Sequence, residues 1–190
     1  MAFIIGILAS QQIAQNLGSF ESIATQTLAS NTASVTFSSI PSTYKHLQIR
    51  FLGRSTRAAA DANIRLQMNG DTATNYSMHD LYGDGTSALA TGSATQTYMD
   101  LGRAPGTSVT NTSVFGVGII DIIDYSSTSK NKTARSFWGY DTNATPSSLL
   151  GLRSGLWQST SAITSITLFQ ASSASWLAGS TIALYGIKGA

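Results

Sequence analysis

Alternation of apolar and polar residues is the main signal in this chain. It is clearest over residues 45–52, where Leu47, Ile49 and Phe51 fall on one face and polar residues separate them. Residues 64–68 repeat the pattern. Because side chains of a β-strand point alternately to opposite faces, a period of two predicts strands that are buried on one side.

Similar segments follow one another along most of the chain. The most apolar, residues 113–125, carries glycines at 116 and 118 that would weaken a helix, so it is predicted to be a long central strand. Residues 76–83 predict an irregular strand or short turn between surface loops. The fold class is therefore all-β, a single antiparallel, jelly-roll-like β-sandwich of about eight to ten strands over residues 19–190. Other predicted strands are 23–28, 34–38, 95–101, 133–140, 149–157, 163–169 and 181–187.

The first eighteen residues differ from the rest. Residues 1–10 are almost wholly apolar but too short to span a bilayer, and no Lys or Arg occurs before Lys45, which argues against a signal peptide. Residues 11–16 suit one or two helical turns ended by Gly18. We predict that residues 1–18 form an apolar docking arm, because such side chains left in water would cause aggregation; the alternative is a terminus without a docking role. The predicted interface residues are Phe3, Ile4, Ile5, Ile7, Leu8, Ile13 and Leu17.

Composition narrows the function classes. Of the 190 residues, 42% are hydrophobic and only 11% are charged, against about 25% in an average protein. Such a surface is polar but weakly ionic, which suits packing in ordered arrays. The net charge of +2 comes from scattered basic residues, so neither nucleic-acid binding nor membrane insertion is expected. Without cysteine there is no disulfide framework.

Catalytic groups do not converge in the sequence. His46 and His79 are isolated, and the pair formed by His79 and Asp80 lacks a nucleophile motif. Asp121 and Asp124 are three residues apart on a strand, so they face opposite sides; Asp121 is better explained by a bonded or paired carboxylate, and Asp124 by an end cap. We predict a protein that is not an enzyme, with no catalytic, cofactor-binding or metal-binding residues and no cofactor.

Turn residues and aromatic residues have structural explanations. Residues 69–71 and 84–85 resemble fragments of calcium loops, but turn chemistry accounts for them. Tryptophans can stack on sugar rings, and core packing is the better interpretation for most of them. Trp176 has no periodic context, so it is predicted to be an exposed or interface aromatic.

An ordered series of segments resembles a family of small structural proteins from the particles of tailed bacteriophages. The series covers most of the chain after residue 20, and its order is more specific than any one segment. The apolar start at residues 6–10 is also similar to the starts of that family. The matching segments are 20–25, 37–50, 64–71 with 75–76, 79–83, 115–125 with Lys130, 154–157, 163–168 and 183–188.

The resemblance implies a virion protein, assembled in the bacterial cytoplasm, with no catalytic residue to carry over. We expect a capsid decoration or cement protein, or a tail or appendage subunit, whose partners are other virion proteins. A homotrimer is expected, since capsid three-fold sites and fibres favour it. The alternative is a receptor-recognition domain of a tail or head fibre that binds host-surface glycan through loops 71–93, 102–112 and 141–148.

Overall fold

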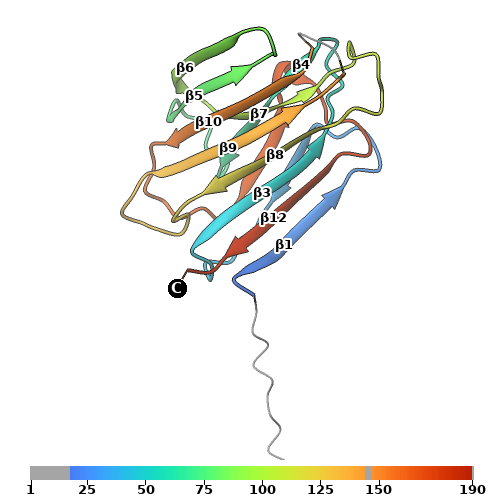
Figure 1. Ribbon diagram of the computed structural model, residues 1–190. Coiled ribbons are helices and arrows are strands. Elements are labelled where there is room, and N and C mark those ends of the chain that lie inside the picture. The colour runs from blue at the N-terminus through green and yellow to red at the C-terminus, as the bar shows by residue number, and fades with distance from the viewer. Residues whose placement is uncertain (1–17, 144–146, 190) are drawn as a thin grey trace, which may run out of the picture.

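Two antiparallel sheets pack face to face in the computed structural model, which describes residues 18–143 and 147–189 (Figure 1). This confirms the predicted β-sandwich. The larger sheet has eight strands in the order β1 (Phe20–Thr27), β12 (Thr181–Ile187), β3 (His46–Gly53), β8 (Gly116–Ile122), β9 (Lys132–Tyr140), β10 (Leu149–Trp157), β5 (Tyr76–Gly83) and β6 (Ala88–Gln96). The smaller sheet has four, in the order β2 (Ser34–Phe37), β11 (Ile166–Gln170), β4 (Asp61–Met68) and β7 (Met99–Pro105).

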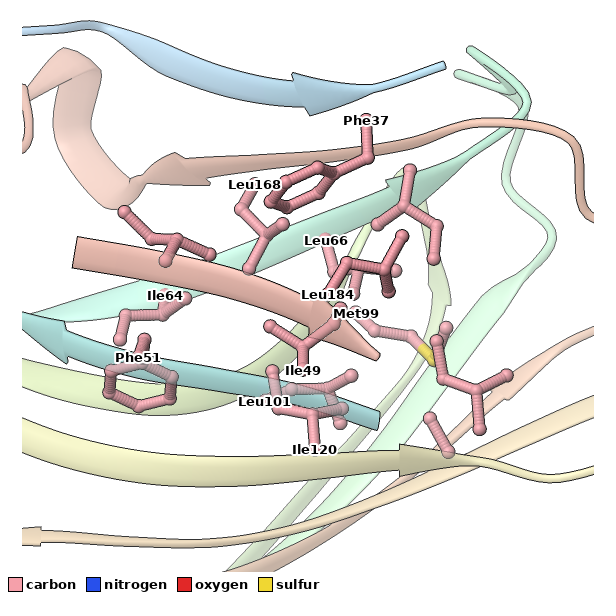
Figure 2. Close-up of a cluster of buried hydrophobic side chains, with 14 of the residues drawn as sticks. Phe37, Ile49, Phe51, Ile64, Leu66, Met99, Leu101, Ile120, Leu168 and Leu184 are labelled. Carbon is pink, nitrogen blue, oxygen red and sulfur yellow. The ribbon is translucent and has the colours of Figure 1, made fainter. Parts of the chain in front are cut away.

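The core forms where the apolar faces of the two sheets meet. In β4 every second residue is fully or almost fully buried, as the alternation predicts, and β3 behaves in the same way. Ile49 and Phe51 of β3 face Ile64 and Leu66 of β4 across the interior (Figure 2). The labelled side chains in Figure 2 come from both sheets, so the sheets share one core.

The region from 71 to 105 corrects the sequence interpretation. The predicted irregular strand at 76–83 is β5, which has a register shift near Tyr76, but the following residues, predicted to be a surface loop, form most of β6. The predicted break from 102 begins later, because β7 continues through Pro105. The sequence of β6 does not alternate between apolar and polar residues, because all its residues are at least partly exposed and neither face needs to be apolar.

Trp176 also corrects the sequence interpretation. Its side chain is 0% exposed, and its ring lies 6.4 Å from that of Phe51. Isolated bridges join its backbone to Thr32 and Ser55, which are remote in sequence. The burial depends on these non-local pairings, so local pattern alone could not reveal it.

Arg54 organises the loop after β7. Its guanidinium donates hydrogen bonds to four backbone carbonyl oxygens, those of Gly106, Val109, Asn111 and Val114, at 2.6–3.2 Å. Burial of the cation lowers the pKa of Arg54. The loop that sequence reasoning treated as a variable surface is therefore tied to a buried arginine.

The described residues contain one short 3₁₀ turn, Ala171–Ser173, and no helix long and apolar enough to cross a membrane. The predicted helical turns at 11–16 and the seven interface residues of the arm lie outside the described residues.

Candidate functional site

The eight-stranded sheet carries a second apolar surface on the side away from the core. Seven large side chains from five adjacent strands are 38–56% exposed there. We call this surface the outer apolar face. It consists of Leu52, Leu81, Val117, Ile119, Phe137, Leu150 and Leu152.

Strand register makes this surface continuous. Ile119 lies opposite Phe137, Phe137 opposite Leu152, and Leu152 opposite Leu81, so four apolar residues form one row across four strands. A second row runs beside it through Leu52, Val117, Gly139 and Leu150. Directly opposed side chains on one face lie within contact distance. The exposed residues are thus one patch and not scattered positions.

The sequence of β8, β9 and β10 explains why both faces of the sheet are apolar. On the inner side small residues leave room for rings: a Cβ on Gly118 would lie 2.3 Å from Phe51, and one on Gly151 2.4 Å from Trp138. The intervening positions, among them Val117, Ile119 and Phe137, point outward. The near-continuous apolar run of residues 113–125 is the sequence signal for this face, because strands apolar on both sides are normally covered on both sides.

Two hollows lie side by side on this surface. The larger has a volume of about 1060 Å³ and the smaller about 700 Å³, and both are lined by Ile119 and Phe137, which therefore stand between them. Gly83 and Gly139 occupy outer positions in the larger hollow and contribute no side chain to its lining. The surface is therefore uneven, as a site for inserted side chains needs to be.

Carboxylates at the rim of the larger hollow are engaged in their own turns. Asp84 accepts hydrogen bonds from Thr86 and Ser87, which lower the pKa of its carboxyl group. Asp141 accepts from the backbone of Asn143 and from the Ser148 hydroxyl, with the same effect on its pKa. Both acids are bonded within their own loops. The rest of the surface that lines the hollow is mainly apolar.

A polar row borders the apolar one. Gln48 donates to Asp121 at 2.8 Å, and the Nε of Arg135 lies 3.9 Å from the same carboxylate. Asp124 follows the end of β8 and binds Lys45 and Lys130, which hold the pKa of its carboxyl group at about 2. The prediction that Asp121 is hydrogen-bonded or paired is confirmed, whereas the Asp124 carboxylate, predicted to cap the strand end, pairs with two lysines.

His79 and Asp80 have different surroundings. His79 is exposed and lines the smaller hollow, whereas the side chain of Asp80 is fully buried. Asp80 Oδ2 lies 2.8 Å from Arg153 Nη2 and 3.5 Å from Arg103 Nη2. Arg103 belongs to the smaller sheet, so the buried acid links the two sheets through arginines. A structural role accounts for every contact of Asp80.

Residues 69–71, which resemble a fragment of a calcium loop, form a turn. Asn69 and Gly70 have positive φ angles, and Asn69 Oδ1 accepts from the backbone of Thr164 and Ser165. Asp71 accepts from the Trp157 indole at 2.7 Å. Within residues 18–143 and 147–189, no three acidic or histidine side chains gather as a metal site would require.

Sequence reasoning did not identify the outer apolar face. The apolar run at 113–125 predicts a central strand, and the strand order of the sheet is needed to show that its second side is not covered by the smaller sheet. Comparison with protein-family models, with curated proteins and with solved structures finds no match to this chain.

Proposed function

We propose that this chain is a non-enzymatic structural subunit of a bacteriophage particle, either a capsid decoration or cement protein or a tail or appendage subunit. One observation carries the assembly role: the outer apolar face, at whose centre the residue Phe137 is 53% exposed. Monomeric soluble proteins rarely expose contiguous apolar patches of more than a few hundred Å² unless a partner covers them. The phage setting rests on the resemblance of the ordered sequence segments.

A protein partner suits this surface better than a host glycan. Sugar recognition combines an aromatic platform with convergent hydrogen-bonding groups. Here the rim acids Asp84 and Asp141 already accept bonds within their own loops, and the hollow is lined mainly by aliphatic and aromatic groups. Apolar side chains of another virion protein satisfy such a site. The receptor-recognition role is the outcome to expect if glycan binds instead.

The apolar arm of residues 1–18 is the second proposed contact with the particle. It carries the apolar residues from Phe3 to Leu17 and no charged side chain. In the assembled particle we expect a trimer, since closed rotational symmetry is the usual form of soluble oligomers and three-fold positions recur in capsids.

Genetic replacement in the phage that carries this gene tests the proposal. Particles are produced with the wild-type chain, with Phe137→Lys, or with Thr133→Lys, and the subunit is quantified in purified particles by mass spectrometry. Thr133 is exposed on the same strand but outside the apolar patch, so it is the matched control. Lysine at 137 would bury an unpaired charge in the proposed contact, and we expect at least a tenfold loss of the subunit from the particles. Thr133→Lys should incorporate normally.

Four outcomes separate the parts of the proposal. Absence of the wild-type subunit from purified particles would contradict the virion role. Equal incorporation of both variants would show that the outer apolar face is not a docking surface. Normal incorporation after deletion of residues 1–18 would remove the arm from the proposal, and cross-linked subunits of a size other than trimer would remove the trimer.

A further inference from the structure

The chain outside the described residues begins at the edge of the sheet that carries the outer apolar face. Gly18 lies two residues before the first residue of β1, and β1 is the edge strand of the eight-stranded sheet (Figure 1). The Phe20 ring stacks on Tyr185 at 4.7 Å, and the Arg50 guanidinium lies 5.0 Å and 5.4 Å from the two ring centroids. Arg50 also lines the larger hollow, so aromatic and cationic groups connect the start of β1 with the apolar face.

The preceding segment has the composition that this face requires. No Asp, Glu, Lys or Arg occurs before Glu21, and residues 3–8 contain five large apolar side chains in six positions. The seven side chains of the outer apolar face are likewise uncharged. Contact between these two sets of side chains removes apolar surface from water on both sides, and neither set carries a charge.

The residues before β1 are long enough to reach the centre of the outer apolar face. Phe137 lies four strands from β1 and four residues further along the strand direction than the row of Phe20. With strands about 4.8 Å apart and a rise of about 3.3 Å per residue, the separation is roughly 23 Å. About twelve residue steps join Leu8 to Phe20, and they span up to roughly 40 Å when extended. Residues 3–8 can therefore reach the centre of the face of their own chain.

We propose that in the free subunit residues 3–8 lie on the outer apolar face of the same chain and cover it. This rests on the proposed function, since it takes that face as the docking surface. A short tether gives the segment an effective concentration in the millimolar range at the face. At micromolar protein it therefore outcompetes the segment of another copy. The two surfaces mask each other until a virion protein displaces the segment, which keeps the free subunit from associating prematurely.

A single spin label tests this contact, because the chain has no cysteine. The full chain with Ala9→Cys carries a nitroxide, and amide signals of the ¹⁵N-labelled protein are compared before and after reduction of the nitroxide. We expect selective broadening of Ile119, Phe137 and Leu152 on the outer face. Gln67 and Thr167, which pair with one another on the smaller sheet, should keep their intensities.

Mixing and substitution controls make the result specific. A mixture of ¹⁵N-labelled chain without nitroxide and unlabelled chain with nitroxide should show no selective broadening. Phe137→Lys in the labelled chain should abolish the effect, and Thr133→Lys should retain it. Uniform or absent broadening in the first sample overturns the proposal, and so does equal broadening in the mixture, which would assign the segment to another copy.

The two proposals fail in different ways. Loss of particle incorporation in Phe137→Lys without any intramolecular broadening would leave the docking face in place and remove the covering segment. Broadening together with normal incorporation of Phe137→Lys would show the reverse: the segment covers the face, but the face does not dock to the particle.

Discussion

Single glycines set how closely the core aromatics approach the eight-stranded sheet. Gly118 lies directly beneath the Phe51 ring and Gly151 beneath Trp138, where a methyl group would overlap ring atoms. Gly83, on the same sheet, has only one neighbour near an added Cβ, the backbone oxygen of Ser87 at 3.5 Å. Identical residues therefore have different requirements according to the ring packed on them.

Gly118→Ala should destabilise the protein by about 1–3 kcal/mol, because the Phe51 ring must move out of a well-packed site. Gly83→Ala should change the free energy of unfolding by less than about 0.5 kcal/mol. Urea unfolding followed by tryptophan fluorescence measures both. Equal stability of the two variants would mean that the ring above Gly118 moves without cost.

Asp71 should make stability depend on pH. The pKa of its carboxyl group lies below the ordinary value, chiefly because the buried Trp157 indole donates to it, and then because Asn75 does. The unfolded chain takes up this proton near pH 3.9, before the folded protein does. The stabilisation is therefore complete above that pH and is lost as the pH falls through the folded pKa.

Asp71→Asn should cost about 1.5 kcal/mol at pH 6, the contribution of a hydrogen bond to a charged group. The difference from wild type should shrink as the pH falls below 4. Urea unfolding of both proteins at pH 6, 4 and 3 measures it. Other acids contribute equally to both proteins and cancel in the difference, so a difference that does not vary with pH would contradict the role of the carboxylate.

Local sequence predicts burial only where a residue is buried because of its place in an alternating strand, and not where partners remote in sequence bury it. Ile64 and Leu66 alternate because their own strand has a dry side. The backbone of Trp176 pairs with Thr32 and Ser55, which are remote in sequence, and the carboxylate of Asp80 pairs with arginines from other strands. Nothing adjacent in the sequence reveals such partners, so these residues were misassigned or left open.

Among the elements, β6 is the least supported strand. It pairs with β5 alone at the edge of the larger sheet, and all its residues are at least partly exposed. The other described edge strands carry protective features: a bulge and Glu21 in β1, a length of four residues in β2, and Pro105 in β7. β6 has neither charge nor proline, and its one irregularity is a register shift against β5 near Tyr76.

Hydrogen exchange should reflect this difference. We expect the paired amides of β6 to exchange at least about a hundredfold faster than those of β3 and β8, because local opening of β6 exposes little buried surface. Exchange at neutral pH followed by NMR gives the rates strand by strand. Protection of β6 equal to that of β8 would indicate that its edge is covered in solution.

The element scale also marks what could be predicted of the fold. Strands at the centre of either sheet were found because their cores impose a period of two, as in β3 and β4. β6 could not be predicted, because the Ala, Thr, Gly and Ser residues at its exposed positions show no alternation of apolar and polar side chains. The order of strands within each sheet depends on long-range pairing and was outside the reach of local pattern.

At the scale of the whole molecule, the larger sheet is apolar on both sides while the sandwich covers only one. The smaller sheet has four strands against eight and can cover only the inner surface. Strand β8 carries apolar residues on both faces: Ile120 and Ile122 are buried, and Val117 and Ile119 are exposed. The outer residues thus contribute little to the fold, which leaves them for assembly.

Matched double substitutions on β8 separate these two roles. Val117→Thr with Ile119→Thr keeps β-branched side chains suited to a strand, so it should change the free energy of unfolding by less than about 1 kcal/mol. Ile120→Thr with Ile122→Thr places hydroxyls in the core and should cost at least about 3 kcal/mol. Urea unfolding measures both, and static light scattering at high concentration measures association. Comparable losses of stability would mean that the outer residues serve the fold; loss of association without loss of stability would assign them to contacts between molecules.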